Sequence, residues 1–158
     1  MSSLEGLLEP GRVLCNVEAR SKKHILEILS ELLASAENDL TAGEIFDSLV
    51  SRERLGSTAL GNGVALPHGR VPGIDASIAA FLRLSQGVEF DAPDGVPVTL
   101  VLGLLVPEEA SEQHLEELSA IAKLLSRPSL REALAQASSS SALYDALTAP
   151  GLPAQAGA

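Results

Sequence analysis

The sequence has few of the residues on which several classes of protein depend. Its 158 residues include only one cysteine, Cys15, so no intrachain disulfide can form and no cysteine cluster could hold zinc or an iron–sulfur centre. We expect Cys15 to be a small buried or half-buried apolar residue. Aromatic residues make up 3% of the chain and apolar residues 46%, so the core must be built from Leu, Val, Ile and Ala.

Positive charge and long apolar runs are also scarce. The chain has 11 basic and 21 acidic residues, a formal net charge of −10, which would repel a nucleic-acid backbone. Its first ten residues contain Glu5 and Glu9 and lack the features of a signal peptide. The longest apolar run, 98–106, is far shorter than the roughly 20 residues of a membrane-spanning helix. We expect no nucleic-acid partner, no membrane insertion and a cytoplasmic location.

The order of predicted elements indicates a layered α/β fold. Ser21 is a suitable N-cap for an amphipathic helix that extends to about residue 36. Thr41 and Glu44 form a capping box at the start of a second helix, which should end near Gly56. Strands are predicted over 13–19, 64–66, 77–84 and 97–106, and further helices over 111–127, 130–137 and 142–147.

The length is typical of one domain with one substantial core. We expect this domain to span residues 1–150, followed by a flexible Pro/Gly-rich tail over 151–158. Between them, residues 56–73 are rich in glycine and turn formers, which predicts a loop, a short strand and another loop.

Among the three histidines, His68 has the most distinctive setting, between Pro67 and Gly69. A stiff residue before it and a residue without a side chain after it would hold the ring and leave it approachable. Such a histidine could be a nucleophile, an acid/base or a ligand. The tripeptide alone allows, about equally, a turn histidine with no chemical task.

The other two histidines are less distinctive. His114 lies in the first turn of the helix predicted from Ser111, where the helix N-terminus favours an anion such as phosphate. A histidine on a mostly apolar face is more often a core residue with a satisfied ring, so both interpretations stay open. His24, beside Lys22 and Lys23, is predicted to be solvated surface.

Signatures of nucleotide, hydrolase and metal sites are missing. The run from Gly56 to Gly63 has the glycine spacing of a phosphate-binding P-loop, but Asn62 and Gly63 stand where Lys and Ser/Thr are required. The sequence contains no G-x-S-x-G or H-E-x-x-H motif, and two histidines without a third ligand make a poor metal site. We expect neither a metal nor a cofactor.

The segment from Arg52 to Arg70, RERLGSTALGNGVALPHGR, closely resembles the active-site signature of enzyme IIA domains of the bacterial phosphotransferase system, fructose and mannitol class. Similar residues occur at 21–32, 104–107 and 114–115, so the resemblance covers nearly the whole chain. Within the class, the sequence is most similar to the free-standing nitrogen-regulatory type. The resemblance implies a central mixed β-sheet flanked by helices on both faces. Arg70 stands where a lysine is common, so the charge is kept.

The resemblance also implies site residues and a phosphoryl donor. His68 would be phosphorylated by an HPr-like phosphocarrier protein, His114 would contact the phosphoryl group, and Arg52 would stabilise its charge. Neutral imidazole, with an ordinary pKa of about 6.5, is a good nucleophile near pH 7. The supporting loop, which would allow close approach, comprises Gly61, Asn62, Gly63, Pro67 and Gly69.

Three functions stay open. The first is a nitrogen-regulatory phosphocarrier that controls kinase or transporter subunits by transient docking, because phosphorylation adds about −1.5 to −2 charges. The second is a sugar-specific IIA component that passes the group to a IIB domain. The third is a module that only docks, against which the intact His68, Arg52 and His114 argue.

Overall fold

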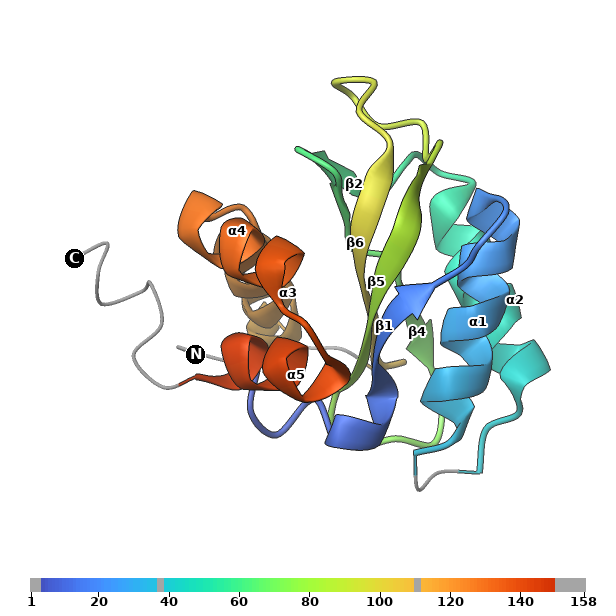
Figure 1. The fold of residues 1–158 in the computed structure, drawn as a ribbon. Coiled ribbons are helices and arrows are strands. Elements are labelled where there is room, and N and C mark those ends of the chain that lie inside the picture. The colour runs from blue at the N-terminus through green and yellow to red at the C-terminus, as the bar shows by residue number, and fades with distance from the viewer. Residues whose placement is uncertain (1–3, 37–38, 110–111, 150–158) are drawn as a thin grey trace.

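A six-stranded mixed sheet lies between two layers of helices in the computed structural model, which describes residues 4–36, 39–109 and 112–149 (Figure 1). The strand order is β1-β5-β6-β3-β2, and β4 also pairs with β6. The strands are β1 (Val13–Val17), β2 (Ala59–Gly61), β3 (Val64–Ala65), β4 (His68–Val71), β5 (Ile78–Val88) and β6 (Val98–Pro107). The helices are α1 (Lys22–Ala34), α2 (Ala42–Glu53), α3 (Glu112–Leu125), α4 (Pro128–Gln136) and α5 (Ser140–Thr148), with a short 3-10 helix, Pro10–Arg12, before β1.

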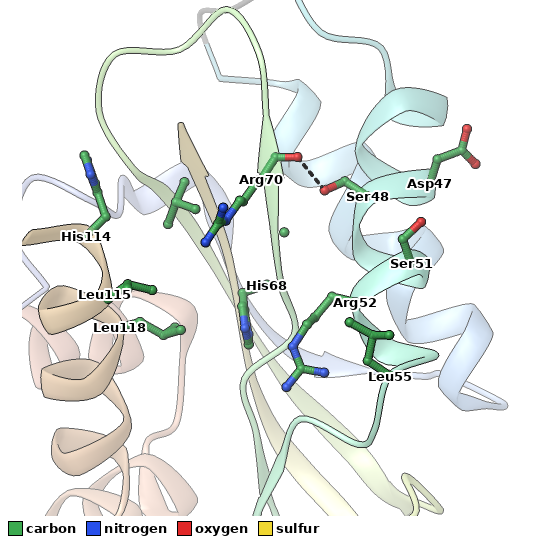
Figure 2. A pocket seen from close by; sticks show the side chains of 12 residues that line it. Asp47, Ser48, Ser51, Arg52, Leu55, His68, Arg70, His114, Leu115 and Leu118 are labelled. Atoms are coloured by element: carbon green, nitrogen blue, oxygen red, sulfur yellow. Dashed lines mark hydrogen bonds between the residues drawn. The ribbon is translucent and has the colours of Figure 1, made fainter. Parts of the chain in front are cut away.

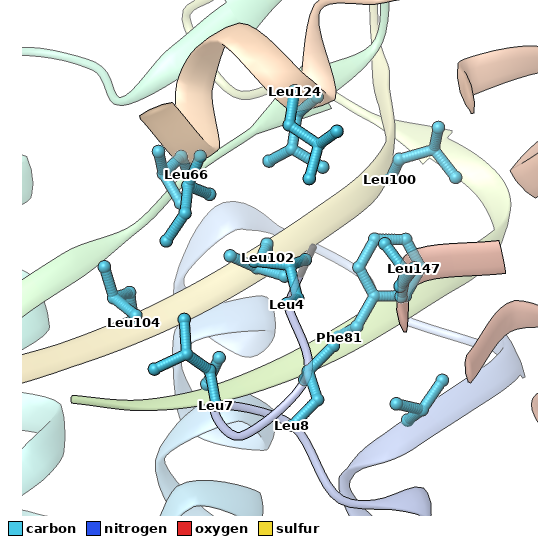
Figure 3. Packing of buried hydrophobic residues seen from close by; sticks show 14 of the residues in the cluster. Leu4, Leu7, Leu8, Leu66, Phe81, Leu100, Leu102, Leu104, Leu124 and Leu147 are labelled. Atoms are coloured by element: carbon cyan, nitrogen blue, oxygen red, sulfur yellow. The ribbon is translucent and has the colours of Figure 1, made fainter. Parts of the chain in front are cut away.

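The central strands separate two apolar cores. Phe81 and Leu102 face α3, α4 and α5, whereas Leu82 and Leu105 face α1 and α2. This alternation follows from the two-residue period of a strand. Figure 3 shows Phe81 and Leu102 in the first core together with Leu147 of α5. Each fully buried side chain of this size contributes about 1.5–3 kcal/mol, so both faces of β5 and β6 stabilise the fold. The mixed sheet covered on both faces is confirmed.

Helix starts follow the local sequence signals. The Ser21 hydroxyl accepts the His24 backbone N–H at 3.1 Å. The Thr41 hydroxyl accepts the Glu44 N–H at 3.1 Å, and the Glu44 carboxylate accepts the Thr41 N–H at 2.9 Å, which confirms the capping box. His24 differs from the expectation. Its ring is half-buried, and Nδ1 accepts the Arg20 backbone N–H at 3.1 Å, so it is part of the helix start and not simply solvated surface.

The segment over 56–73 contains more strand than the sequence predicted, because β2 and β4 were missed. β2 and β3 form a hairpin whose turn residues, Asn62 and Gly63, have φ angles of 58° and 81°. Positive φ at both turn residues matches the right-handed twist of a two-residue hairpin, and Asn-Gly is well suited to it.

β3 and β4 then continue along the same edge of β6 in one register. Val64 pairs with Leu100 and His68 with Leu104, so the offset between the paired residues is the same across both strands. Between the strands, the Leu104 N–H donates to the Pro67 carbonyl at 2.9 Å. His68 is therefore the first residue of a strand and not a turn residue.

The remaining predicted elements are present with slightly different ends. Cys15 is half-buried in β1, as expected. The predicted tail over 151–158 lies outside the described residues. None of the helices in the described ranges is both long and apolar enough to cross a membrane.

Candidate functional site

His68 lies in a cleft of about 690 Å³ between α2, β4 and α3 (Figure 2). Arg52 of α2 and His114 of α3 also line this cleft, so the three predicted site residues share one cavity. Two rim residues, Leu55 and Leu115, are apolar but 83% and 54% exposed. His68 and Arg52 also line an adjoining cavity of about 330 Å³.

The backbone around His68 determines which ring nitrogen is free. Nδ1 lies 2.8 Å from the backbone oxygen of Leu66. Because a carbonyl oxygen can only accept a hydrogen bond, Nδ1 carries the proton and Nε2 keeps its lone pair. Pro67 supports this arrangement through its backbone bond to Leu104. The arrangement leaves Nε2 as the ring nitrogen with an available lone pair.

The surroundings of His68 keep its ring neutral. Burial is the main cause that lowers its pKa below the usual 6.5, and the nearby Arg52 guanidinium lowers it further. The hydrogen bond to Leu66 and the Glu53 carboxylate act in the opposite direction but do not reverse the shift. Near pH 7 the imidazole is therefore unprotonated at Nε2, which is the form that can attack phosphorus.

Arg52 is held at the end of α2. Its Nη1 donates to the Gly56 carbonyl oxygen at 2.9 Å, which ties the side chain to the loop that follows the helix. Figure 2 shows the guanidinium beside the His68 ring. This placement brings a permanent positive charge to the place where a phosphoryl group on His68 would lie.

The neighbour of Arg52 in the sequence, Glu53, belongs to a largely buried charged network. The Glu53 carboxylate accepts two hydrogen bonds from Thr58, from its backbone N–H at 2.9 Å and from its hydroxyl at 2.7 Å. The same carboxylate lies 2.9 Å from the Lys22 ammonium. The network ties the end of α2 to the start of α1 and to the chain before β2. Sequence reasoning missed Glu53 and Lys22. A signal was present, because Glu53 continues the helical spacing of the buried residues Ile45 and Leu49.

His114 lines the cleft from the opposite wall. It is half-buried in the first turn of α3, and Figure 2 shows its imidazole pointing away from His68. Leu118, one turn further along α3, also lines the cleft. The structure thus brings His114 to the cleft without placing its ring against His68.

The predicted glycine loop lies elsewhere. Gly61, Asn62 and Gly63 line neither of the two cavities beside His68. The Asn62 N–H instead donates to the Asp94 carboxylate at 2.8 Å, and a Cβ on Gly61 would lie 3.3 Å from that carboxylate. These residues form a tight turn, and their geometry does not support close approach to a phosphoryl group.

Gly69 has a packing role that the sequence did not indicate. A Cβ at this position would overlap the Ser48 side chain and lie 3.1 Å from the Ser48 carbonyl carbon. Glycine therefore lets α2 approach β4 closely. This contact sets the spacing between Arg52 and His68 across the cleft.

Comparison with known proteins identifies the family. Residues 6–149 match the family described as "Phosphoenolpyruvate-dependent sugar phosphotransferase system, EIIA 2". The chain belongs to this family. The resemblance noted in the sequence is thereby confirmed.

Similar proteins narrow the type of EIIA chain. The chain is 49% identical over 144 residues to a nitrogen regulatory protein of Pseudomonas aeruginosa, and the match covers 91% of this chain and 94% of the relative. The structure of nitrogen regulatory protein IIA-Ntr from Neisseria meningitidis is similar at a TM-score of 0.84 and 44% identity, covering 90% of this chain and 97% of that one. IIA mannitol from Escherichia coli shares the fold at a TM-score of 0.73 and 22% identity, with coverages of 89% and 99%.

The chain is accordingly a phosphotransferase system EIIA component involved in phosphoryl transfer and a homologue of nitrogen regulatory proteins. Its cleft is lined by the imidazole of His68 and the guanidinium of Arg52. Among the described residues of this EIIA chain, no group of three or more His, Cys, Asp or Glu side chains is placed to hold a metal ion.

Proposed function

We propose that this EIIA chain is a phosphoryl carrier of the nitrogen-regulatory phosphotransferase system, which works in the cytoplasm and accepts its phosphoryl group on Nε2 of His68 from an HPr-like phosphocarrier protein. The observation that carries the proposal is the setting of the His68 ring. Its proton is held on Nδ1 by the Leu66 carbonyl, its pKa is lowered by burial, and a guanidinium stands beside it.

The transfer needs little from the protein beyond positioning and charge. Nε2 of His68 forms a new N–P bond as the N–P bond on the donor breaks, and Nδ1 keeps its proton and its bond to Leu66. Arg52 stabilises the equatorial phosphoryl oxygens, since transfer of this group depends mostly on positioning and electrostatics. His114 contributes a further contact if its ring turns toward the cleft.

The phosphorylation state would then regulate partner proteins, such as kinase or transporter subunits. Phosphorylation adds about −1.5 to −2 charges beside the apolar rim formed by Leu55 and Leu115, which changes how a partner docks. The 49% identity to a nitrogen regulatory protein favours this role. The alternative is a sugar-specific IIA component that passes its group to a IIB domain, and the likeness to IIA mannitol at 22% identity supports only a shared fold.

The test is intact-mass spectrometry at neutral to alkaline pH after incubation with phosphoenolpyruvate, enzyme I and the phosphocarrier protein. Wild type and the control variant His24→Ala should gain one acid-labile phosphoryl group, and His68→Ala should gain none. His114→Ala should be phosphorylated more slowly but not blocked. No gain in wild type, while the same relay phosphorylates a known EIIA protein, would overturn the proposal.

The sugar-specific alternative has its own assay. Purified phosphorylated protein is mixed with fructose-type and mannitol-type IIB domains, and the transfer of the group is followed over time. Rapid transfer to either IIB domain would favour the alternative over the regulatory role.

A further inference from the structure

We propose that Arg70 is a second guanidinium ligand of the phosphoryl group as it reaches His68. The inference rests on the proposed function, because it concerns the same transfer. It assigns to the α3 side of the cleft the role that Arg52 has on the α2 side.

The strand places Arg70 on the same face as His68. Side chains alternate along β4, so residues 68 and 70 point to one face and Gly69 points to the other, against Ser48 of α2. Both His68 and Arg70 line the cleft. In Figure 2 the Arg70 side chain points from β4 toward the α3 side of the cleft, where His114 lies.

The backbone under Arg70 is held on both sides. The Ser48 hydroxyl donates to the Arg70 carbonyl oxygen at 2.8 Å, and Arg70 pairs with Val106 of β6. At the next residue, the Glu108 N–H donates to the Val71 carbonyl oxygen at 2.8 Å. The Arg70 side chain therefore extends from a fixed backbone two residues after His68. An arginine side chain is long enough to reach from there toward the His68 ring.

The guanidinium of Arg70 is uncommitted. The residue is exposed, and across the part of the chain that the structure describes no hydrogen bond or ion pair engages its guanidinium. Arg52 differs, because its Nη1 already donates to Gly56. A planar guanidinium with free donors is suited to bind two oxygens of a phosphoryl group at once.

The charge in the cleft also favours this role. The chain carries a net charge of −10, and Asp47 lines the same cleft, so an incoming phosphoryl group meets a repulsive background. Arg52 lies on one side of the His68 ring and the His114 ring points away from it. Arg70 is the side chain that can supply a cation from the remaining side.

The test compares Arg70→Gln, Arg70→Lys and the matched control Arg54→Gln. Arg54 is also exposed and follows α2 directly, but it does not line the cleft. The rate of phosphorylation by the HPr-like donor is measured at saturating and at low donor concentration, and the phosphorus NMR shift of the phosphorylated proteins is recorded. Wild type and His68→Ala are measured in parallel to test whether transfer occurs on His68. Failure of the proposed function can therefore be distinguished from failure of the role of Arg70.

We expect Arg70→Gln to slow transfer roughly tenfold to a hundredfold even at saturating donor, as loss of a charge-assisted contact in the transition state does. Arg70→Lys should recover part of the rate, and Arg54→Gln should transfer like wild type. The phosphorus shift should move in Arg70→Gln but not in Arg54→Gln. Two outcomes would overturn the proposal. The first is a wild-type rate of transfer in Arg70→Gln. The second is that Arg70→Gln and Arg54→Gln slow transfer equally at low donor concentration and not at saturating donor, which would mean that Arg70 only attracts the donor protein at long range.

Discussion

Replacing Gly69 by alanine should push apart the two walls of the cleft. The new methyl group would overlap the Ser48 side chain and lie 3.1 Å from the Ser48 carbonyl carbon, a backbone atom that cannot rotate away. The Ser48 hydroxyl would lose its 2.8 Å hydrogen bond to the Arg70 carbonyl oxygen. Since α2 must then move by a few tenths of an ångström, Arg52 would move away from His68.

Opposing contributions set the size of the effect. Overpacking costs about 1–3 kcal/mol, and loss of a neutral hydrogen bond costs about 0.5–1.5 kcal/mol. Alanine also restricts the unfolded chain, which offsets about 0.4–1 kcal/mol because the φ angle of Gly69 is not positive. We therefore expect Gly69→Ala to lower the free energy of unfolding by about 0.5–4 kcal/mol, with a central value of about 2 kcal/mol.

Urea unfolding of wild type, Gly69→Ala, Ser48→Ala and the double variant measures this effect. Ser48→Ala alone should lose only its hydrogen bond, about 0.5–1.5 kcal/mol. The double variant should be more stable than the sum of the single effects predicts, because the overlap with the hydroxyl is gone. An NMR titration should also show the His68 pKa closer to 6.5 in Gly69→Ala, since Arg52 is farther away. An unchanged unfolding midpoint together with an unchanged His68 pKa would refute the reasoning.

Three further predictions concern charge around His68. An NMR titration should give His68 a pKa below 6.5, and Arg52→Gln should raise it because the guanidinium no longer opposes the imidazolium. Because the folded pKa is depressed, the contribution of the neutral ring to stability is complete above pH 6.5 and is lost as the pH falls through the folded pKa. His68→Gln should flatten the pH dependence of unfolding in that window, and an unaltered profile would contradict the shift. Glu53→Gln should lower the free energy of unfolding, measured in urea, by about 2–4 kcal/mol. This loss is somewhat smaller than for breaking a fully buried ion pair, because the Lys22 side chain is 22% exposed and its ammonium still lies 3.4 Å from the Asp91 carboxylate. Lys22→Met is the matched variant, and a loss below about 0.5 kcal/mol in both would show that the pair has only the value of a surface ion pair.

Much of the fold was predictable because its signals are local. The capping box of Thr41 and Glu44 involves residues three positions apart, and β6 is apolar along almost its whole length, so each can be recognised without its neighbours. The grouping of Arg52, His68 and His114 came from the family resemblance, not from periodicity. The structure brings these residues to one cleft.

What the sequence did not show depends on contacts between distant residues. β4 contains a glycine and a histidine and forms only because β6, which follows much later in the chain, pairs with it. The ion pair of Glu53 joins it to Lys22, on a different helix. The direction of the His114 ring and the contact of Gly69 with Ser48 likewise depend on how α2, α3 and the sheet pack together.

In a protein with this site, residues between Val64 and Val71 can be substituted more easily than residues can be inserted or deleted there. β3 and β4 keep one register against β6, so a single residue inserted or deleted before His68 would turn every later side chain of β4 to the opposite face. His68 would then point toward α2, and Gly69 would take its place on the face toward α3. The exposed residues 93–97, between β5 and β6, are not paired in the sheet, and their link to the β2–β3 turn is the 2.8 Å hydrogen bond from the Asn62 N–H to Asp94. Length differences among proteins with a histidine at this position should therefore occur in that turn and not in the strands that hold the ring.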